Sequence, residues 1–168
     1  LTDASAIDHG NGGTVALWSD VINPYSFTTA TGHLKAEAGR LGGDGGRIET
    51  SGYGLDVAGI QVSTLSLKGL TGVWLLDPSD IKITNTTLTI QGVGSSPTVF
   101  STPTAAGFVN TADLQAALAA SNVEITTAGS GTGTGDITLD SNITVNTSTK
   151  LTLKAHRDIV LNANYNQT

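Results

Sequence analysis

The stretch Gly42-Gly43-Asp44-Gly45-Gly46-Arg47-Ile48-Glu49-Thr50-Ser51-Gly52 decides the fold class of this chain. Four glycines surround Asp44, and a helix interior does not tolerate this density because each glycine costs about 1 kcal/mol relative to alanine. A short β-like run, residues 47–50, follows, and apolar-polar alternation resumes with Leu55 and Val57 after Ser51-Gly52. Short strands and tight turns, with no helix-length segment between them, are typical of a coiled β-structure.

A second informative stretch is Val73-Trp74-Leu75-Leu76-Asp77-Pro78. Its continuous apolar run predicts a strand that is buried on both faces. Pro78 ends this strand because proline has no N–H to donate to a sheet. We therefore expect structural roles for this segment, with Trp74 and Leu76 in the core and Asp77 and Pro78 closing the strand.

The last third of the chain contains the clearest repeat. Four similar triplets begin at Ile137, Ile143, Leu151 and Ile159, at intervals of 6, 8 and 8 residues, so that Ile137 should stack on Ile159 after 22 residues. Three short strands per turn and this period are typical of a three-sided solenoid. An antiparallel sandwich is the alternative, but it needs two-residue Asn-Gly or Asp-Gly turns, and the only Asn-Gly pair is Asn11-Gly12.

We predict an all-β fold, a parallel β-helix (β-solenoid), in which residues 1–168 form a single segment. Residues 92–110 are rich in Ser, Thr, Pro and Gly and are predicted to form a loop protrusion. Residues 111–120 are predicted to form a short helix, with Thr111 as its N-cap and with Leu114 and Leu118 on one face. The predicted strands are 14–18, 47–50, 55–62, 64–68, 73–76, 81–83, 87–91, 123–127, 137–139, 143–145, 151–154 and 159–162.

The composition excludes several classes of function. Eight basic and fourteen acidic residues give a net charge of −6, which argues against nucleic acid as a partner and against an anionic membrane surface. The absence of cysteine excludes disulfides and thiolate metal sites. No apolar stretch reaches the length of a membrane span, and no signal peptide is visible. Because Leu1 is not a natural start, we expect this chain to be an internal fragment of a longer one.

Several phrases of the sequence together resemble the repeat region of filamentous-haemagglutinin-type exoproteins, which are bacterial adhesins exported by two-partner secretion. The phrases cover most of the chain, and their order is more specific than any one of them. They are the Gly-rich turn with Glu49-Thr50-Ser51-Gly52, Trp74-Leu75-Leu76-Asp77-Pro78, Asp113-Leu114-Gln115-Ala116-Ala117-Leu118, Asn122-Val123-Glu124-Ile125-Thr126-Thr127, Gly135-Asp136-Ile137-Thr138 and Leu151-Thr152-Leu153-Lys154-Ala155-His156-Arg157-Asp158-Ile159.

This resemblance implies a right-handed parallel β-helix that is secreted or displayed on the bacterial cell surface and that mediates cell adhesion or filament formation. It implies an outer-membrane two-partner transporter as the partner during export, and a glycan or protein of a host or neighbouring cell as the ligand. It implies no catalytic residues, and we expect no cofactor and no metal. Because neither end of the sequence carries an obvious cap, we also expect end-to-end self-association.

Two kinds of candidate site follow from the residues. Trp18, Tyr25 and Phe27 are candidates for an exposed aromatic binding surface, since aromatic residues are frequent in such surfaces. Asp44 could belong to a calcium loop, although a plain corner turn accounts for it better because no Asp repeat follows.

A carbohydrate-active enzyme that cleaves polysaccharides is the alternative function, because parallel β-helices also host such enzymes. It would require that stacking bring the scattered carboxylates into one cluster. The acids in question are Asp56, Asp77, Asp80, Glu124, Asp136, Asp140 and Asp158.

Overall fold

The structure is a computed structural model that describes residues 1–86, 107–127 and 133–168. Within these residues the chain is mostly β, with one helix, and its strands form parallel sheets. The elements are β1 (Thr2–Asp3), β2 (Thr14–Trp18), β3 (Phe27–Thr29), β4 (Gly32–Lys35), β5 (Arg47–Ser51), β6 (Gly54–Asp56), β7 (Ile60–Ser63), β8 (Val73–Asp77), β9 (Ile81–Thr84), β10 (Gly107–Asn110), α1 (Thr111–Leu118), β11 (Asn122–Thr126), β12 (Ile137–Leu139), β13 (Ile143–Val145), β14 (Leu151–Lys154), β15 (Ile159–Leu161) and β16 (Tyr165–Gln167).

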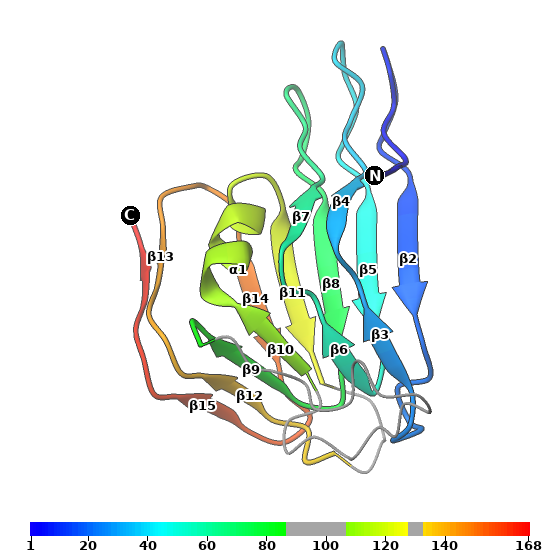
Figure 1. Ribbon diagram of the computed structural model, residues 1–168. Coiled ribbons are helices and arrows are strands. Elements are labelled where there is room, and N and C mark those ends of the chain that lie inside the picture. The colour runs from blue at the N-terminus through cyan, green and yellow to red at the C-terminus, as the bar shows by residue number, and fades with distance from the viewer. Residues whose placement is uncertain (87–106, 128–132) are drawn as a thin grey trace.

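The chain returns to the same sheets again and again (Figure 1). One sheet has five strands in the order β14-β11-β8-β5-β2, and a second has six in the order β15-β12-β9-β10-β6-β3. Two smaller sheets have the orders β1-β4-β7 and β13-β16. Every pairing between the described strands is parallel, so the antiparallel sandwich alternative is wrong. This arrangement is compatible with a β-helix or solenoid.

The core consists of rows of side chains that run from strand to strand. Because alternate residues of a strand face opposite sides of the sheet, one set of positions in the five-stranded sheet faces inward throughout. Each fully buried aliphatic or aromatic side chain contributes about 1.5–3 kcal/mol. One inward-facing row crosses all five strands of this sheet at the paired positions Val15, Ile48, Trp74, Val123 and Leu151.

Trp74 is the largest fully buried side chain, and Leu76 on the same strand is fully buried as well, as the continuous apolar run predicts. The indole Nε1–H of Trp74 donates a hydrogen bond of 3.0 Å to Oγ1 of Thr50, which is also buried. The buried indole therefore has the polar partner that its N–H requires. Leu75 is buried on the opposite face, as the prediction of a strand buried on both faces requires, and Pro78 is buried directly after the strand ends at Asp77.

The repeat in the last third of the chain has the predicted register. Ile137 of β12 pairs directly with Ile159 of β15, and β13 pairs with β16 in the same manner. The spacing of 22 residues therefore corresponds to one complete return of the chain to the same sheet. This part of the sequence prediction is confirmed.

Helix α1 occupies the place of a strand between β7 and β13 (Figure 1). Leu114 and Leu118 of the helix are fully buried, as predicted. The prediction of Thr111 as the N-cap is wrong, because the side chain of Asn110 accepts the hydrogen bond from the Ala112 N–H and Thr111 is already helical. A helix side chain also supplies a hydrogen-bond acceptor where a neighbouring strand would supply a backbone carbonyl. Oε1 of Gln115 accepts a hydrogen bond of 2.8 Å from the backbone N–H of Thr144 in β13.

Three other predictions concern residues 64–68, 87–91 and 92–110. Residues 64–68 were predicted to form a strand, but they belong to a loop, where Ser66 Oγ donates to the backbone oxygen of Gly43 in the neighbouring loop. The predicted strand 87–91 and residues 92–106 of the predicted loop lie outside the described residues. Residues 107–110, the end of that predicted loop, form β10 instead, which pairs with both β6 and β9.

Candidate functional site

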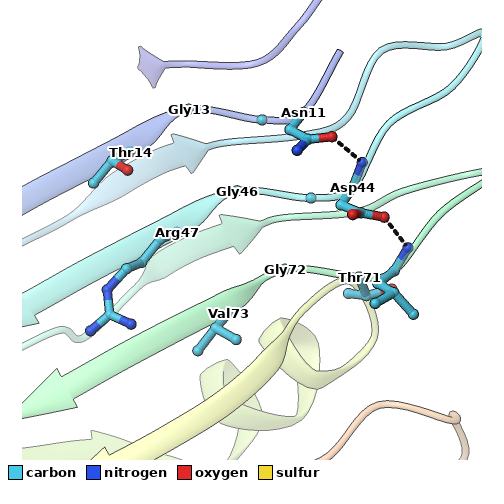
Figure 2. Close-up of a pocket in the computed structure, with 12 residues that line it drawn as sticks. Asn11, Gly13, Thr14, Asp44, Gly46, Arg47, Thr71, Gly72 and Val73 are labelled. Carbon is cyan, nitrogen blue, oxygen red and sulfur yellow. Dashed lines mark hydrogen bonds between the residues drawn. The ribbon is translucent and has the colours of Figure 1, made fainter. Parts of the chain in front are cut away.

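A groove lies where β2, β5 and β8 begin, at the base of three stacked loops (Figure 2). Its volume is about 430 Å³, and we call it the glycine groove because glycines line it at each of the three levels. The groove is lined by Asn11, Gly12, Gly13, Thr14, Asp44, Gly45, Gly46, Arg47, Leu70, Thr71, Gly72 and Val73.

Close backbone packing explains the glycines of this groove. A Cβ added to Gly46 would lie 2.0 Å from the backbone oxygen of Gly13, and one added to Gly72 would lie 2.1 Å from that of Gly46. Real Cβ atoms do not approach an oxygen so closely. Only glycine therefore fits at these positions, where successive levels of the chain are stacked. The dense glycines of residues 42–46 therefore follow from contact between neighbouring passes of the chain.

A ladder of side-chain hydrogen bonds forms one wall of the groove. Asn11 Oδ1 accepts from the backbone N–H of Asp44, and Asp44 Oδ1 accepts from that of Leu70, each at 2.8 Å (Figure 2). Asp44 thus serves as a corner residue that ties one level to the next. Within the described ranges no group of three or more His, Cys, Asp or Glu side chains is placed to hold a metal ion.

The outer face of the five-stranded sheet continues from the other wall of the groove. Arg47 Nη2 lies 3.6 Å from Glu49 Oε2, and Ser51 Oγ donates to Glu49 Oε1 at 3.1 Å. The exposed Trp18 lies at the far end of β2 from the groove. Three rows cross strands β2, β5 and β8 on this face: Thr14, Arg47 and Val73; Ala16, Glu49 and Leu75; Trp18, Ser51 and Asp77.

Asp77 is the most perturbed carboxyl group of this face. Burial, and to a smaller extent the nearby Glu49 carboxylate, together raise its pKa to about 6. One of its oxygens, Oδ1, is buried and has no hydrogen-bond donor among the described residues. A buried acceptor without a partner favours the protonated form of the acid.

The pKa of Asp77 gives a prediction for the pH dependence of stability. Because the folded state raises this pKa above the unfolded value of 3.8, folding favours the proton, and the unfolding free energy should fall as pH rises from about 4 to about 6. The loss should be about 1 kcal/mol, after discounting for the solvent screening of a half-exposed group. Asp77→Asn should abolish this decrease, which urea denaturation at a series of pH values would measure.

A matched comparison isolates this effect from other acids. Asp136 and Asp140 have lowered pKa values, because Arg157 and Lys82 respectively donate hydrogen bonds to them, so they act below pH 4 and with the opposite sign. Both groups are present in the wild type and in Asp77→Asn, and their contributions cancel in the difference between the two curves. Parallel curves between pH 4 and pH 6 would contradict the assignment to Asp77.

The predicted aromatic residues differ in exposure. Trp18 is 70% exposed and Tyr25 is 73% exposed, whereas Phe27 is partly buried where β3 begins. The three lie on or beside the connection from the five-stranded to the six-stranded sheet, and Ile22 in the same connection is also exposed. The sequence identified these aromatic residues but did not reveal that Trp18 shares a row with Ser51 and Asp77.

The remaining predicted acids lie apart from this face or are engaged in contacts. Glu124 lies on this outer face two strands from Glu49, and it pairs with Lys154 at 2.8 Å. Asp80 accepts hydrogen bonds from Thr134, Gly135 and Asp136. The others have local partners: Asp56 accepts from the Ala58 N–H, Asp136 pairs with Arg157, Asp140 pairs with Lys82, and Asp158 pairs with Arg157.

Comparisons with family models and with curated proteins do not assign this chain to a family. No model of a known protein family matches the chain, and no curated protein matches it. In the portion of the chain that the structure describes, no helix combines the length and apolar character needed to cross a bilayer.

Proposed function

We propose that this chain is a right-handed parallel β-helical segment of a filamentous-haemagglutinin-type exoprotein, secreted or displayed on a bacterial surface. Its role is structural and adhesive: it extends the rod and presents a binding face to a glycan or protein of a host or neighbouring cell. The order of sequence phrases that spans most of the chain supports this family. Export through an outer-membrane two-partner transporter follows from the same resemblance.

The observation that carries the proposal is the in-register pairing of the five-stranded sheet. Five passes of the chain contribute one strand each, and inward rows such as Ile48-Trp74-Val123 continue across them. An architecture that grows by adding like units is suited to a rod that holds a binding surface away from the cell. The paired carboxylates Asp136, Asp140 and Glu124 fit this role better than catalysis, because an ion-paired carboxylate is a weak acid–base catalyst.

Adhesion is tested with beads coated with the purified 168-residue chain. We expect the beads to bind epithelial or bacterial cells above the level of beads coated with albumin. Trp18→Ala should reduce this binding, whereas Leu67→Ala, at a side chain of similar exposure on the stacked loops and outside the groove lining, should not. Binding equal to that of albumin would contradict the adhesive role.

The gene neighbourhood tests the family independently, since an adjacent transporter gene and an N-terminal secretion domain are expected.

The alternative is a polysaccharide-cleaving enzyme, and one observation favours it. Asp77 and Glu49 are neighbouring carboxyl groups, and the pKa of Asp77 is raised to about 6, which is a pattern found in acid–base pairs. Release of reducing ends from a panel of polysaccharides, abolished by Asp77→Asn and by Glu49→Gln, would establish this activity.

Sedimentation of the purified chain over a range of concentrations tests the expected end-to-end self-association.

A further inference from the structure

We propose that the glycine groove and the adjoining outer face of β2 and β5 bind an uncharged oligosaccharide, with Arg47 as a hydrogen-bond donor and Trp18 as a stacking platform. This inference rests on the proposed adhesive function and names the class of ligand that the binding face takes. Two separate features of the surface support it: a groove of ligand size and an exposed indole on the same face.

The groove has a suitable size and a fixed shape. Its volume of about 430 Å³ lies within the range of roughly 300–1,000 Å³ that is common for small-molecule sites. Its glycines cannot be replaced by larger residues that would fill it, because a Cβ at Gly45 or Gly46 would collide with backbone atoms. The hydrogen bonds from Asp44 to Asn11 and from Leu70 to Asp44 hold one wall in place before any ligand binds. Preorganisation of this kind reduces the entropic cost of binding.

The balance of charge in the groove selects the ligand class. Asp44 and Arg47 are the only charged side chains among the lining residues, and they have opposite signs. An anionic ligand would meet the Asp44 carboxylate, and a cationic ligand would meet the Arg47 guanidinium. The other polar groups, on Asn11, Thr14 and Thr71, are uncharged, so an uncharged ligand that is rich in hydroxyl groups matches the lining best.

Arg47 has hydrogen-bonding capacity to spare. Its side chain is 52% exposed, and its contact with Glu49 is long, at 3.6 Å between Nη2 and Oε2. A guanidinium group carries five N–H donors in a fixed plane, so several of them can meet the hydroxyl and ring oxygens of a sugar. Glu49 beside it supplies an acceptor for hydroxyl donors.

Trp18 extends the site along β2. Its indole is 70% exposed, and only Ala16 lies between it and Thr14 on the outer face of the strand, so no bulky side chain interrupts the path. Four residues of strand span about 13 Å, which accommodates a short run of sugar rings. The C–H groups on one face of a pyranose ring can pack on the indole, and this contact adds apolar area at a low cost in side-chain entropy.

The test uses the complete 168-residue chain on an array of immobilised glycans. The array carries neutral hexose and N-acetylhexosamine oligomers, sulfated and sialylated glycans, and a hexalysine peptide. We expect saturable binding to one or more neutral oligomers, which Arg47→Gln and Trp18→Ala each weaken by at least about tenfold.

The matched control is Lys154→Gln. Lys154 lies on the outer face of the same sheet, is 59% exposed and pairs with Glu124, but it is three strands away from Arg47. This variant should bind as the wild type does. Because all three substitutions are on exposed or half-exposed side chains, thermal unfolding should confirm that each variant is folded.

Three outcomes would overturn the inference. They are binding confined to sulfated, sialylated or hexalysine probes, no binding to any neutral oligomer, and neutral-glycan binding that neither Arg47→Gln nor Trp18→Ala weakens. The bead assay separates this inference from the proposed function. Beads that adhere to cells, combined with no binding to neutral glycans, would leave adhesion standing and remove this site. Glycan binding without cell adhesion would do the reverse.

Discussion

Replacing Trp74 with alanine is expected to lower the free energy of unfolding by about 3–5 kcal/mol. Trp74 is fully buried and lies in the inward row between Ile48 and Val123, so its removal leaves a cavity in the middle of the core. The change also removes the N–H that Thr50 accepts, and the buried hydroxyl then lacks its partner. Urea denaturation of the wild type and the variant measures the difference.

Trp18→Ala provides the matched control, since it removes the same side chain from an exposed position at the end of β2. Its effect on stability should stay within about 0.5 kcal/mol. Equal losses for the two variants would show that the inward row around Trp74 does not carry the core.

Gly46→Ala is expected to have an effect of similar size, about 3 kcal/mol or more. The new Cβ would lie 2.0 Å from the backbone oxygen of Gly13 and 2.7 Å from that of Gly12. These atoms belong to the neighbouring level of backbone and cannot rotate away as a side chain would, so β2 and β5 must separate at their first residues. The result is expected as a large fall in melting temperature and in the midpoint of urea denaturation.

Gly32→Ala separates a steric clash from the general cost of replacing a glycine. Gly32 has φ +80°, and a Cβ there would have no atom within 4 Å. Its replacement should therefore cost only about 1–2 kcal/mol, from the left-handed backbone conformation. A loss for Gly46→Ala no larger than that for Gly32→Ala would contradict close packing at the groove.

Local patterns in the sequence predicted most of the strands. Alternation identified β2, β12, β13 and β14 with their observed bounds, and the period of 22 residues gave the pairing of Ile137 with Ile159. These features depend on residues near one another in the chain, which explains why the sequence alone reveals them.

Contacts between distant residues were not predictable in this way. The alternation of Leu65, Ser66 and Leu67 indicated a strand, but in the structure Ser66 makes side-chain contact with the loop of Gly43. The bond from Trp74 to Thr50 likewise depends on which strands become neighbours. The candidate site shows the same limit, because the sequence identified Trp18 but not Arg47, which joins the lining of the glycine groove only when β2, β5 and β8 align.

The long connection that contains α1 has a consequence for chain entropy. Paired positions on successive strands of the five-stranded sheet are 26 residues apart from Arg47 to Val73, but 49 apart from Val73 to Asn122, where the connection contains α1. Each doubling of a flexible loop costs only about 0.6 kcal/mol in closure entropy. A connection of nearly twice the length is therefore a small cost beside the burial of one leucine.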